Sequence, residues 1–326
     1  MKEVRLLRAQ PGAITEADFT VIERPVPVKA PGVVVTRTLW ISIDPYLALR
    51  IRDHVPTQGD CAPWPMTSRT IGVVIRGDGE RFAEGDHVLG FGRWAEFDAR
   101  PPADLVRIED ADVPMSAHLG AAGHSGFTAW LGLRLGQLKP GETVLVSGAA
   151  GAVGSLAGQL AKAAGCRVIG IAGGREKTKW VMDLGFDGCA DHHLPDLAAQ
   201  IAQAASDGVD LHFENVGAAT LDPALANMRR HGRVALCGLV QHYQGSSPVT
   251  LTQFRRVLEA SIRIEPFSIY DHSDLFPQAK AELTTALRGG TLRLRETVTD
   301  GIEQLPAAFV GMLAGRGYGK HLVRLP

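Results

Sequence analysis

The sequence predicts an α/β protein of two domains, an irregular β-barrel-like domain and a doubly wound parallel sheet. The length of 326 residues exceeds what one hydrophobic core usually fills. The first third is rich in β-branched residues, proline and glycine, whereas strand-like and helix-like segments alternate from about Leu119 onward.

The first third contains apolar segments that are typical of strands, and turn sequences such as RGDGE and FAEGD separate them. The segments are VVVTRTLWISI (33–43), RTIGVVIRG (69–77), DHVLGFGRWAEF (86–97) and PADLVRI. We therefore expect this part to form the β-barrel-like domain.

The segment after Leu119 reads as strands that alternate with helices. The predicted strands are TVLVSG, CRVIGIAG, GCADHH, VDLHFENVG, RVALCGLV and SIRIEPFSI. The predicted helices between them are AVGSLAGQLAKAAG, REKTKWVMDLGF, LPDLAAQIAQAASDG and a helix that runs through ALANMRRHG. Six strands in βαβ units match a complete dinucleotide-binding sheet.

The C-terminal tail again mixes the two patterns. FPQAKAELTTALRGG and IEQLPAAFVGMLAG read as helices, and TLRLRETVTDG and GKHLVRL read as extended. Because no further βαβ unit follows, we expect the tail to return to the first domain.

The composition argues against several classes of partner and location. The net charge is −1, with 34 basic and 35 acidic side chains and no charged tail, so we expect neither nucleic acid nor an anionic membrane as a partner. The cysteines, Cys61, Cys166, Cys189 and Cys237, have no pair spacing and read as free thiols of a reducing cytosol. The N-terminus, MKEVRLLRAQPG, has no apolar stretch of signal-peptide length, so we predict a cytoplasmic protein.

One uncharged stretch, 143–161, has almost the length of a membrane span. It contains several glycines, and its apolar period changes in the middle. We therefore predict a buried strand followed by a helix of small residues.

A glycine-rich turn, SGAAGAVGS, joins that strand to that helix and places Gly148, Gly151 and Gly154 three residues apart. Glycines let the backbone approach a pyrophosphate, and a helix N-terminus offers free N–H groups and a positive dipole end. The alternative is an empty structural turn, but the series of βα units favours dinucleotide binding.

The stretch IAGGREK (171–177) indicates which dinucleotide is bound. An NAD-binding protein usually has an acidic residue here, which holds the adenosine ribose. This chain instead has Gly173 and Gly174, then Arg175 and Lys177, which leave room for a 2′-phosphate and can neutralise it. The sequence therefore predicts NADPH. The alternative is a solvated basic helix start, since Lys179 follows.

The distribution of possible metal ligands argues against catalytic zinc, which needs three protein ligands. The candidates are His54, Cys61, His87, His118 and His124, which are spread out along the chain. We expect no metal, and therefore hydride transfer to an acceptor that is already activated.

Several long segments resemble one known group. They are WISIDPYLALRIRD, GFTAWLGL, the stretch from GETVLVSG to GGREK, FENVG, RVALCGLVQHYQ and GYGKHLVRL. Together they resemble the zinc-free medium-chain dehydrogenase/reductase superfamily, and within it the leukotriene B4 dehydrogenase / prostaglandin reductase / alkenal double-bond reductase group. The resemblance implies a GroES-like catalytic domain (1–119 and 297–326) and a Rossmann domain that binds NADPH (120–296).

The resemblance also implies an activity. NADPH would reduce a carbon–carbon double bond conjugated to the carbonyl of a small ketone or aldehyde, with hydride transfer to the β-carbon. Tyr243 matches the tyrosine that stabilises the resulting enolate, and Pro45 and Tyr46 match the wall of the active-site mouth. A homodimer joined at the last strand of the Rossmann sheet is implied as well.

The family's cofactor contacts carry over by motif, with Lys177 matching the lysine that contacts the 2′-phosphate. The matching positions are Pro45, Thr128, Ala150, Gly151, Ala152, Val153, Gly154, Gly173, Gly174, Arg175, Lys177, His192, Asn215, Val216, Cys237, Gly238, Tyr243, Phe267 and Gly317.

The chain also departs from the family pattern. His124 and Ser125 stand where Met-Pro is usual, so His124 is either a residue of the pocket wall or a proton donor. His192 replaces a tyrosine, and Gly317 or Tyr318 takes the place of an asparagine. Two other readings stay open: a zinc-free quinone oxidoreductase and a non-catalytic NADPH-binding protein.

Overall fold

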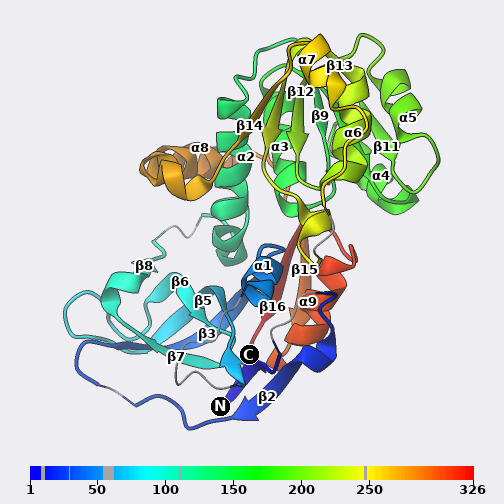
Figure 1. Cartoon of the computed structure of the whole chain (residues 1–326). Helices are drawn as coiled ribbons and strands as arrows, with labels where there is room; N and C mark the ends of the chain where they lie inside the picture. Colours follow the sequence, from blue (N-terminus) through cyan, green and yellow to red (C-terminus); the bar gives the residue numbers. More distant parts are fainter. Residues whose placement is uncertain (9–11, 29, 54–61, 110–111, 246–247) are drawn as a thin grey trace. The chain divides into compact units, whose positions relative to one another are not determined.

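The computed structural model describes residues 1–8, 12–28, 30–53, 62–109, 112–245 and 248–326. The chain divides into two compact units (Figure 1). Unit 1 comprises Met1–Leu119, Tyr243–Ser246 and Glu296–Pro326, and unit 2 comprises Gly120–His242 and Ser247–Arg295. The short segment around Tyr243 thus groups with unit 1, whereas the sequence placed it inside the second domain.

Unit 2 contains the predicted parallel sheet. Six strands lie in the order β11-β10-β9-β12-β13-β14, and all neighbouring strands are parallel. The strands are β9 (Thr143–Val146), β10 (Arg167–Ala172), β11 (Gly188–Asp191), β12 (Val209–Glu214), β13 (Met228–Leu236) and β14 (Arg263–Pro266). This order and direction confirm the doubly wound fold.

Helices cover both faces of this sheet. They are α2 (His124–Leu135), α3 (Ala152–Ala163), α4 (Arg175–Asp183), α5 (Leu197–Ala204), α6 (Ala218–Asn227), α7 (Arg255–Glu259) and α8 (Phe276–Arg288). Successive residues of β9 point to opposite faces: Val144 and Val146 belong to one buried cluster and Leu145 to another. The uncharged stretch 143–161 is therefore strand β9 and most of α3, as predicted.

The boundary between α6 and β13 differs from the prediction. The sequence extended the helix through ALANMRRHG, but α6 ends at Asn227 and β13 begins at Met228. Met228 is buried and pairs with Val209 of β12. Pairing with the neighbouring strand overrides the helical propensity of the arginines that follow.

Unit 1 is built mainly of β-strands. One sheet has the order β15-β16-β3-β5-β6-β8, with β7 also paired to β3, and a smaller sheet has the order β2-β1-β4. The strands are β1 (Lys2–Leu6), β2 (Phe19–Glu23), β3 (Val34–Ile43), β4 (Trp64–Pro65), β5 (Thr67–Arg76), β6 (His87–Arg93), β7 (Phe97–Arg100), β8 (Leu105–Arg107), β15 (Glu296–Asp300) and β16 (Lys320–Arg324). The helices are α1 (Leu47–Arg52) and α9 (Leu305–Leu313).

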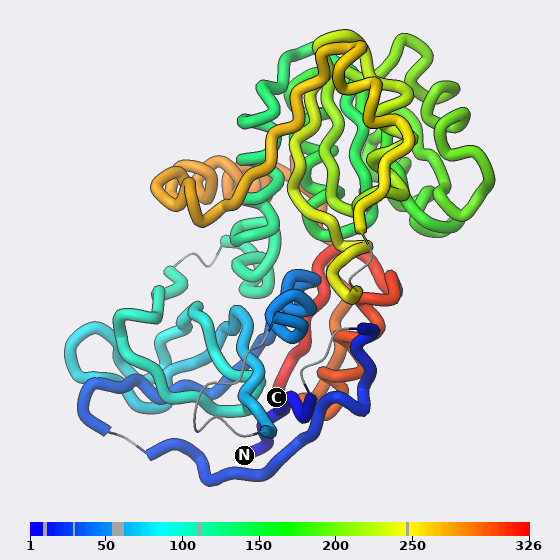
Figure 2. The backbone as a smooth tube through the Cα atoms, in the orientation of Figure 1, coloured from blue at the N-terminus to red at the C-terminus, as the bar shows by residue number. Residues whose placement is uncertain are grey.

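Two features of unit 1 bear on the predictions. The segment 86–97 was expected to be one strand, but the chain breaks at Trp94, which is fully buried and donates from Nε1 to Oγ of Ser68 (2.9 Å). The C-terminal strand β16 pairs antiparallel with β3, and Figure 2 shows this red segment among the N-terminal strands.

Within the described part of the chain, no helix has both the length and the apolar character needed to cross a membrane.

Candidate active site

Predicted cofactor residues follow the carboxyl end of every strand in the sheet of unit 2. Ala150–Gly154 follow β9, Gly173–Lys177 follow β10, His192 follows β11, Asn215 and Val216 follow β12, Cys237 and Gly238 follow β13, and Phe267 follows β14. The carboxyl ends of parallel strands meet at one edge, which is where α/β sheets bind their ligands. The structure therefore brings these residues to one edge of the sheet.

The glycine turn packs closely on the start of α3. Gly148 has a φ of +58°, and the N–H of Gly151 donates to the carbonyl oxygen of Gly148 (2.9 Å). A Cβ atom on Gly154 would lie only 2.4 Å from the same oxygen. Gly151 caps α3 without a side-chain hydrogen bond, which suits binding of an anion by the backbone N–H groups. The turn thus fits a pyrophosphate.

The turn between β10 and α4 has an acidic neighbour that the sequence did not reveal. Oδ1 of Asp191, at the end of β11, accepts hydrogen bonds from the N–H groups of Gly174 (2.8 Å) and His193 (2.9 Å). Burial alone would raise the pKa of Asp191, but these bonds outweigh burial and hold the pKa below its usual value. The two residues directly after β10 are glycines, but the neighbouring strand supplies an acid to the turn.

Basic side chains surround the same turn. Arg175 begins α4 and is exposed, and Lys177 is half-buried in the first turn of that helix. Burial lowers the pKa of Lys177. His192 follows β11, and its main-chain N–H donates to the carbonyl oxygen of Ala172, the last residue of β10 (3.1 Å). Arg175 and Lys177, which are predicted to receive a 2′-phosphate, therefore lie at the start of α4, and the loop that carries His192 is its neighbour in the same unit.

A buried polar network supports the loop after β12. Asn215 is held against the end of β9: its main-chain N–H donates to Oγ of Ser147 (2.8 Å) and its Nδ2 to the Ser147 carbonyl oxygen (2.7 Å). Glu214 is fully buried and accepts from Ser147 Oγ (3.0 Å) and from Thr220 Oγ1 (3.0 Å). His212 contacts Glu214 as well.

The prediction missed this network, although a signal exists in VDLHFE. Ionisable residues at alternating positions of an otherwise apolar strand lie on one face and need partners when buried. The neighbouring loop depends on the same residue, because the N–H groups of Cys237 (2.9 Å) and Gly238 (3.2 Å) donate to the Glu214 carbonyl oxygen. Burial, together with the charge of Glu214, raises the pKa of Cys237 to about 12, so this residue is a thiol at neutral pH.

Helix α2 carries two predicted site residues. Oγ1 of Thr128 donates to the carbonyl oxygen of His124 (2.7 Å). The ring of His124 lies 6.0 Å from the rings of both Tyr270 and Phe276, edge-on to each. Within unit 2, His124 therefore belongs to a group of aromatic side chains. Phe267, after β14, packs edge-on against Phe213 of β12, with the ring centroids 6.3 Å apart.

The remaining predicted residues lie in unit 1. Tyr46, at the start of α1, and Tyr243 are partly buried against the same core cluster, which includes Leu47 and Phe309. The N–H of Ala48 donates to the carbonyl oxygen of Pro45 (3.0 Å) and so closes the turn into α1. The structure thus brings Tyr46 and Tyr243, which are far apart in sequence, to one apolar cluster.

Gly317 lies in the loop before β16, with a φ of +82°. The next residue, Tyr318, is fixed through its backbone: its N–H donates to Oγ1 of Thr297 (2.9 Å), and that hydroxyl donates to the Tyr318 carbonyl oxygen (2.9 Å). Thr297 therefore holds the loop in which Gly317 or Tyr318 stands where the family usually has an asparagine.

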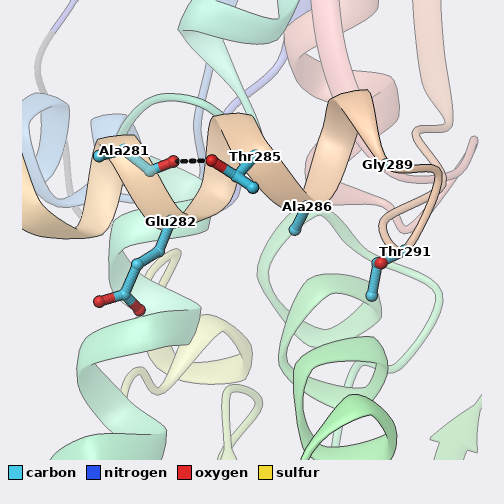
Figure 3. A pocket seen from close by; sticks show the side chains of 6 residues that line it. All are labelled: Ala281, Glu282, Thr285, Ala286, Gly289 and Thr291. Carbon is cyan, nitrogen blue, oxygen red and sulfur yellow. Dashed lines mark hydrogen bonds between the residues drawn. The ribbon is translucent and has the colours of Figure 1, made fainter.

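Figure 3 shows a hollow of about 530 Å³ on α8 and the turn after it. Its lining residues are Ala281, Glu282, Thr285, Ala286, Gly289 and Thr291. Thr285 Oγ1 donates to the carbonyl oxygen of Ala281 (2.9 Å), within the helix. None of these residues is a predicted site residue, and none follows a strand of the sheet.

The next question is whether the structure groups the candidate metal ligands that lie among the described residues. Among the described residues, no three His, Cys, Asp or Glu side chains are grouped so that they could hold a metal ion. His54 and Cys61 lie outside the described residues.

Comparison with known proteins identifies the family. The family model described as "N-terminal domain of oxidoreductase" matches residues 2–108, and the model described as "Zinc-binding dehydrogenase" matches residues 152–285. The NADPH-dependent curcumin reductase of Escherichia coli is 35% identical over 96% of this chain and 94% of that enzyme. The NADP(+)-dependent 2-alkenal reductase of Nicotiana tabacum is 34% identical over 99% of this chain and 96% of that enzyme.

This chain belongs to the zinc-free medium-chain dehydrogenase/reductase superfamily. Within that superfamily it falls in the leukotriene B4 dehydrogenase / prostaglandin reductase / alkenal double-bond reductase group, as its motifs predicted. The crystal structure of CurA from Vibrio vulnificus in complex with NADPH has a TM-score of 0.92 and 33% identity, and the match covers 100% of this chain and 99% of that one. The protein is therefore an oxidoreductase of this family, with the two-part α/β fold of that structure.

Proposed function

We propose that the protein reduces the carbon–carbon double bond of an α,β-unsaturated ketone or aldehyde with NADPH. The observation that carries this proposal is the similarity over nearly the whole chain to enzymes named for the reduction of curcumin and of 2-alkenals. A 2-alkenal contains a double bond conjugated to an aldehyde. The substrate we propose is therefore a small molecule with this conjugated unit.

The carboxyl edge of the sheet in unit 2 suits NADPH. The glycine turn and the start of α3 would hold the pyrophosphate, and Arg175 and Lys177 would hold the 2′-phosphate. The positions proposed for the nicotinamide end are Pro45, Thr128, Asn215, Val216, Cys237, Gly238, Tyr243, Phe267 and Gly317. When bound, NADPH supplies the hydride that the β-carbon of the substrate receives.

Tyr243 carries the catalytic part of the proposal. Negative charge develops on the carbonyl oxygen as the double bond is reduced, and a hydroxyl donor aimed at that oxygen stabilises the charge. We assign this role to the Tyr243 hydroxyl and a positioning role in the substrate wall to Tyr46. His124, which packs against aromatic rings, is proposed as a further residue of the substrate site.

The assembly is part of the same proposal. We infer that unit 1 is the GroES-like catalytic domain, that unit 2 is the NADPH-binding domain, and that the protein is a cytoplasmic homodimer. β14 is the edge strand of the six-stranded sheet, and an edge strand offers unpaired backbone groups to a second copy. The oligomeric state in solution tests this part independently.

The activity is tested by following the loss of reduced nicotinamide absorbance with a medium-chain 2-alkenal, a linear enone and a benzoquinone, each with NADPH and with NADH. We expect turnover of the alkenal or the enone with NADPH, and deuterium from the C4 position of NADPH at the β-carbon of the product. Turnover of the quinone alone would instead make the protein a quinone oxidoreductase. Binding of NADPH without turnover of any acceptor would indicate a non-catalytic NADPH-binding protein.

A further inference from the structure

A lysine side chain is buried in unit 1 at the point where strand β16 begins and strand β3 ends. Lys320 is 5% exposed, and its neighbour His321 pairs with Ile43, the last residue of β3. The Lys320 ammonium donates to the carbonyl oxygen of Ile43 (3.3 Å) and forms an ion pair with Oδ1 of Asp44. The other carboxylate oxygen of Asp44 accepts a hydrogen bond from the hydroxyl of Ser42. Lys320 therefore binds both the backbone and the acidic side chain at the end of β3.

Asp44 is the residue from which the chain turns into α1. The N–H of Leu47 donates to the Asp44 carbonyl oxygen (3.1 Å), and the N–H of Leu49 donates to the carbonyl oxygen of Tyr46 (3.0 Å). Tyr46 is the N-cap residue of α1, and its side chain makes no capping hydrogen bond. The ion pair holds this turn from outside the helix, through a lysine that follows Asp44 by 276 positions in the sequence.

The same lysine lies close in sequence to a second segment with a proposed site residue. Gly317 precedes Lys320 in the loop before β16, and Gly317 and Gly319 both have a positive φ (+82° and +57°). On its other edge β16 pairs with β15, where Glu296 is opposite Lys320. Burial raises the pKa of Glu296, whereas a hydrogen bond with Ser116 and the charge of Lys320 oppose this rise. The ammonium group thus interacts with a carboxylate on each side of β16.

The energetics of a buried ion pair indicate what this arrangement can contribute. Removing two charges from water costs much of what their attraction returns, and well-packed apolar residues of similar volume often stabilise a protein equally well. An ammonium group, however, directs its N–H donors at particular acceptors, here the Ile43 carbonyl oxygen and the Asp44 carboxylate. The pair therefore defines where Asp44 lies, and the turn that starts there carries Tyr46.

We propose that Lys320 is a positioning residue, which acts through Asp44 to fix the turn that places Tyr46 in the wall of the substrate site. This inference rests on the proposed function, in which Tyr46 belongs to that wall. Without the ion pair, the first residue of the turn loses its charged partner and the wall becomes less ordered. The acceptor then binds more weakly, whereas the chemical step changes little, because Tyr243 is not altered.

The test compares Lys320→Met, which keeps the length of the side chain but removes its charge, with the matched control Arg324→Met. Arg324 lies on the same strand and forms an exposed ion pair with Asp300 of β15 (2.7 Å). Steady-state kinetics at saturating NADPH gives kcat and KM for the best acceptor among a 2-alkenal, an enone and a benzoquinone. Amide hydrogen exchange, followed by mass spectrometry, reports on the order of segment 44–52, with β6 as the reference segment. Thermal unfolding checks that each variant folds.

We expect Lys320→Met to raise KM for the acceptor by about tenfold or more, with kcat within about threefold of the wild type. Exchange in segment 44–52 should become faster, whereas exchange in β6 should not change. Asp44→Asn breaks the same ion pair and should reproduce both effects, which keeps the test available if Lys320→Met does not fold. Arg324→Met should match the wild type in KM and in exchange.

A double variant tests whether the effect passes through Tyr46. Tyr46→Ala removes the side chain of the proposed wall, so Lys320→Met should raise KM no further in the Tyr46→Ala background. Two residues that act independently would instead give effects that add on the free-energy scale, and this result would overturn the inference.

Two further results would overturn the inference. One is lower thermal stability of Lys320→Met with an unchanged KM, which would make the residue structural only; the other is an equal rise in KM in Arg324→Met. If the wild type reduces none of the acceptors, the proposed function is lost, and the exchange experiment decides the role of Lys320. Unchanged exchange in segment 44–52 would then overturn that role, and faster exchange confined to this segment would support it.

Discussion

Nε2 of His212 lies 2.6 Å from Oε2 of Glu214, and both side chains are fully buried in unit 2. The other ring nitrogen of His212, Nδ1, lies 3.1 Å from the carbonyl oxygen of Leu145 in the neighbouring strand β9. Oε1 of Glu214 also accepts from the N–H groups of Val216 and Gly217, the latter at 2.8 Å. The pair therefore connects the centre of the sheet to a loop at its carboxyl edge.

The first prediction concerns the stability that this pair provides. Glu214→Gln should lower the free energy of unfolding by about 3 kcal/mol, because fixed buried donors lose a charged acceptor. Urea unfolding at neutral pH measures the change. Glu84→Gln, an exposed change in unit 1, should stay within about 0.5 kcal/mol of the wild type. Equal stability of both variants would show that Glu214 is not important for the fold.

The second prediction concerns how the difference in unfolding free energy between the wild type and Glu214→Gln depends on pH. Burial would raise the pKa of Glu214, but the hydrogen bond and charge of His212 and the N–H groups of Val216 and Gly217 outweigh burial and lower the pKa. The stabilisation is fully present above the unfolded pKa, about 4.3, and is lost as pH falls through the folded pKa. The gap between the wild type and Glu214→Gln should thus narrow as pH falls below about 4. A gap that widens below about pH 4 would contradict the assigned sign.

The glycine turn gives a third prediction. Gly154→Ala places a Cβ atom 2.4 Å from the Gly148 carbonyl oxygen, so the turn must move, although alanine favours a helix. The affinity for NADPH should fall by about tenfold or more, equivalent to at least 1.4 kcal/mol. Gly151→Ala is the matched variant, because its Cβ atom would lie 3.2 Å from the same oxygen and should weaken binding less. The reverse order of the two affinities would show that the close approach at Gly154 does not set the turn.

Local patterns were sufficient to predict much of this molecule. The parallel sheet followed from apolar strands between helices, and the glycine turn from three glycines between a strand and a helix. The strands β1 and β2 were missed because they pair with each other across a long connection, as Val4 does with Val21. Two short strands that lie this far apart in the sequence show too little alternation of apolar and polar residues to be recognised from the sequence.

The candidate site was less predictable, because its contacts also join residues that are far apart in the sequence. Asp191 comes to the turn after β10 only because β11 lies beside β10, and Ser147 reaches Glu214 only because β9 lies beside β12. Neither contact can be derived from the spacing of the residues in the chain. The family motifs supply the proposed cofactor positions, such as Asn215, but not the polar groups that hold these residues in place.

The fourth prediction concerns the choice of cofactor. Lys177→Ala should raise the Michaelis constant for NADPH by about 10- to 100-fold, which corresponds to the loss of one charged hydrogen bond, and should leave NADH nearly unaffected. Steady-state kinetics with both cofactors measures the effect. Lys179→Ala, an exposed change on the same helix, should behave as the wild type. An equal loss with both cofactors would show that Lys177 does not contact the 2′-phosphate.

The last prediction concerns the proposed donor to the substrate. Tyr243→Phe removes only a hydroxyl and should lower kcat by about tenfold to a thousandfold, because the charge on the carbonyl oxygen loses a donor in the transition state. Tyr46→Phe, on the same apolar cluster, should change KM more than kcat, because Tyr46 is assigned to the wall of the substrate site. Thermal unfolding of both variants checks that the cluster stays packed. An unchanged kcat in Tyr243→Phe would exclude its hydroxyl from the reaction and leave the enolate to be stabilised by another group.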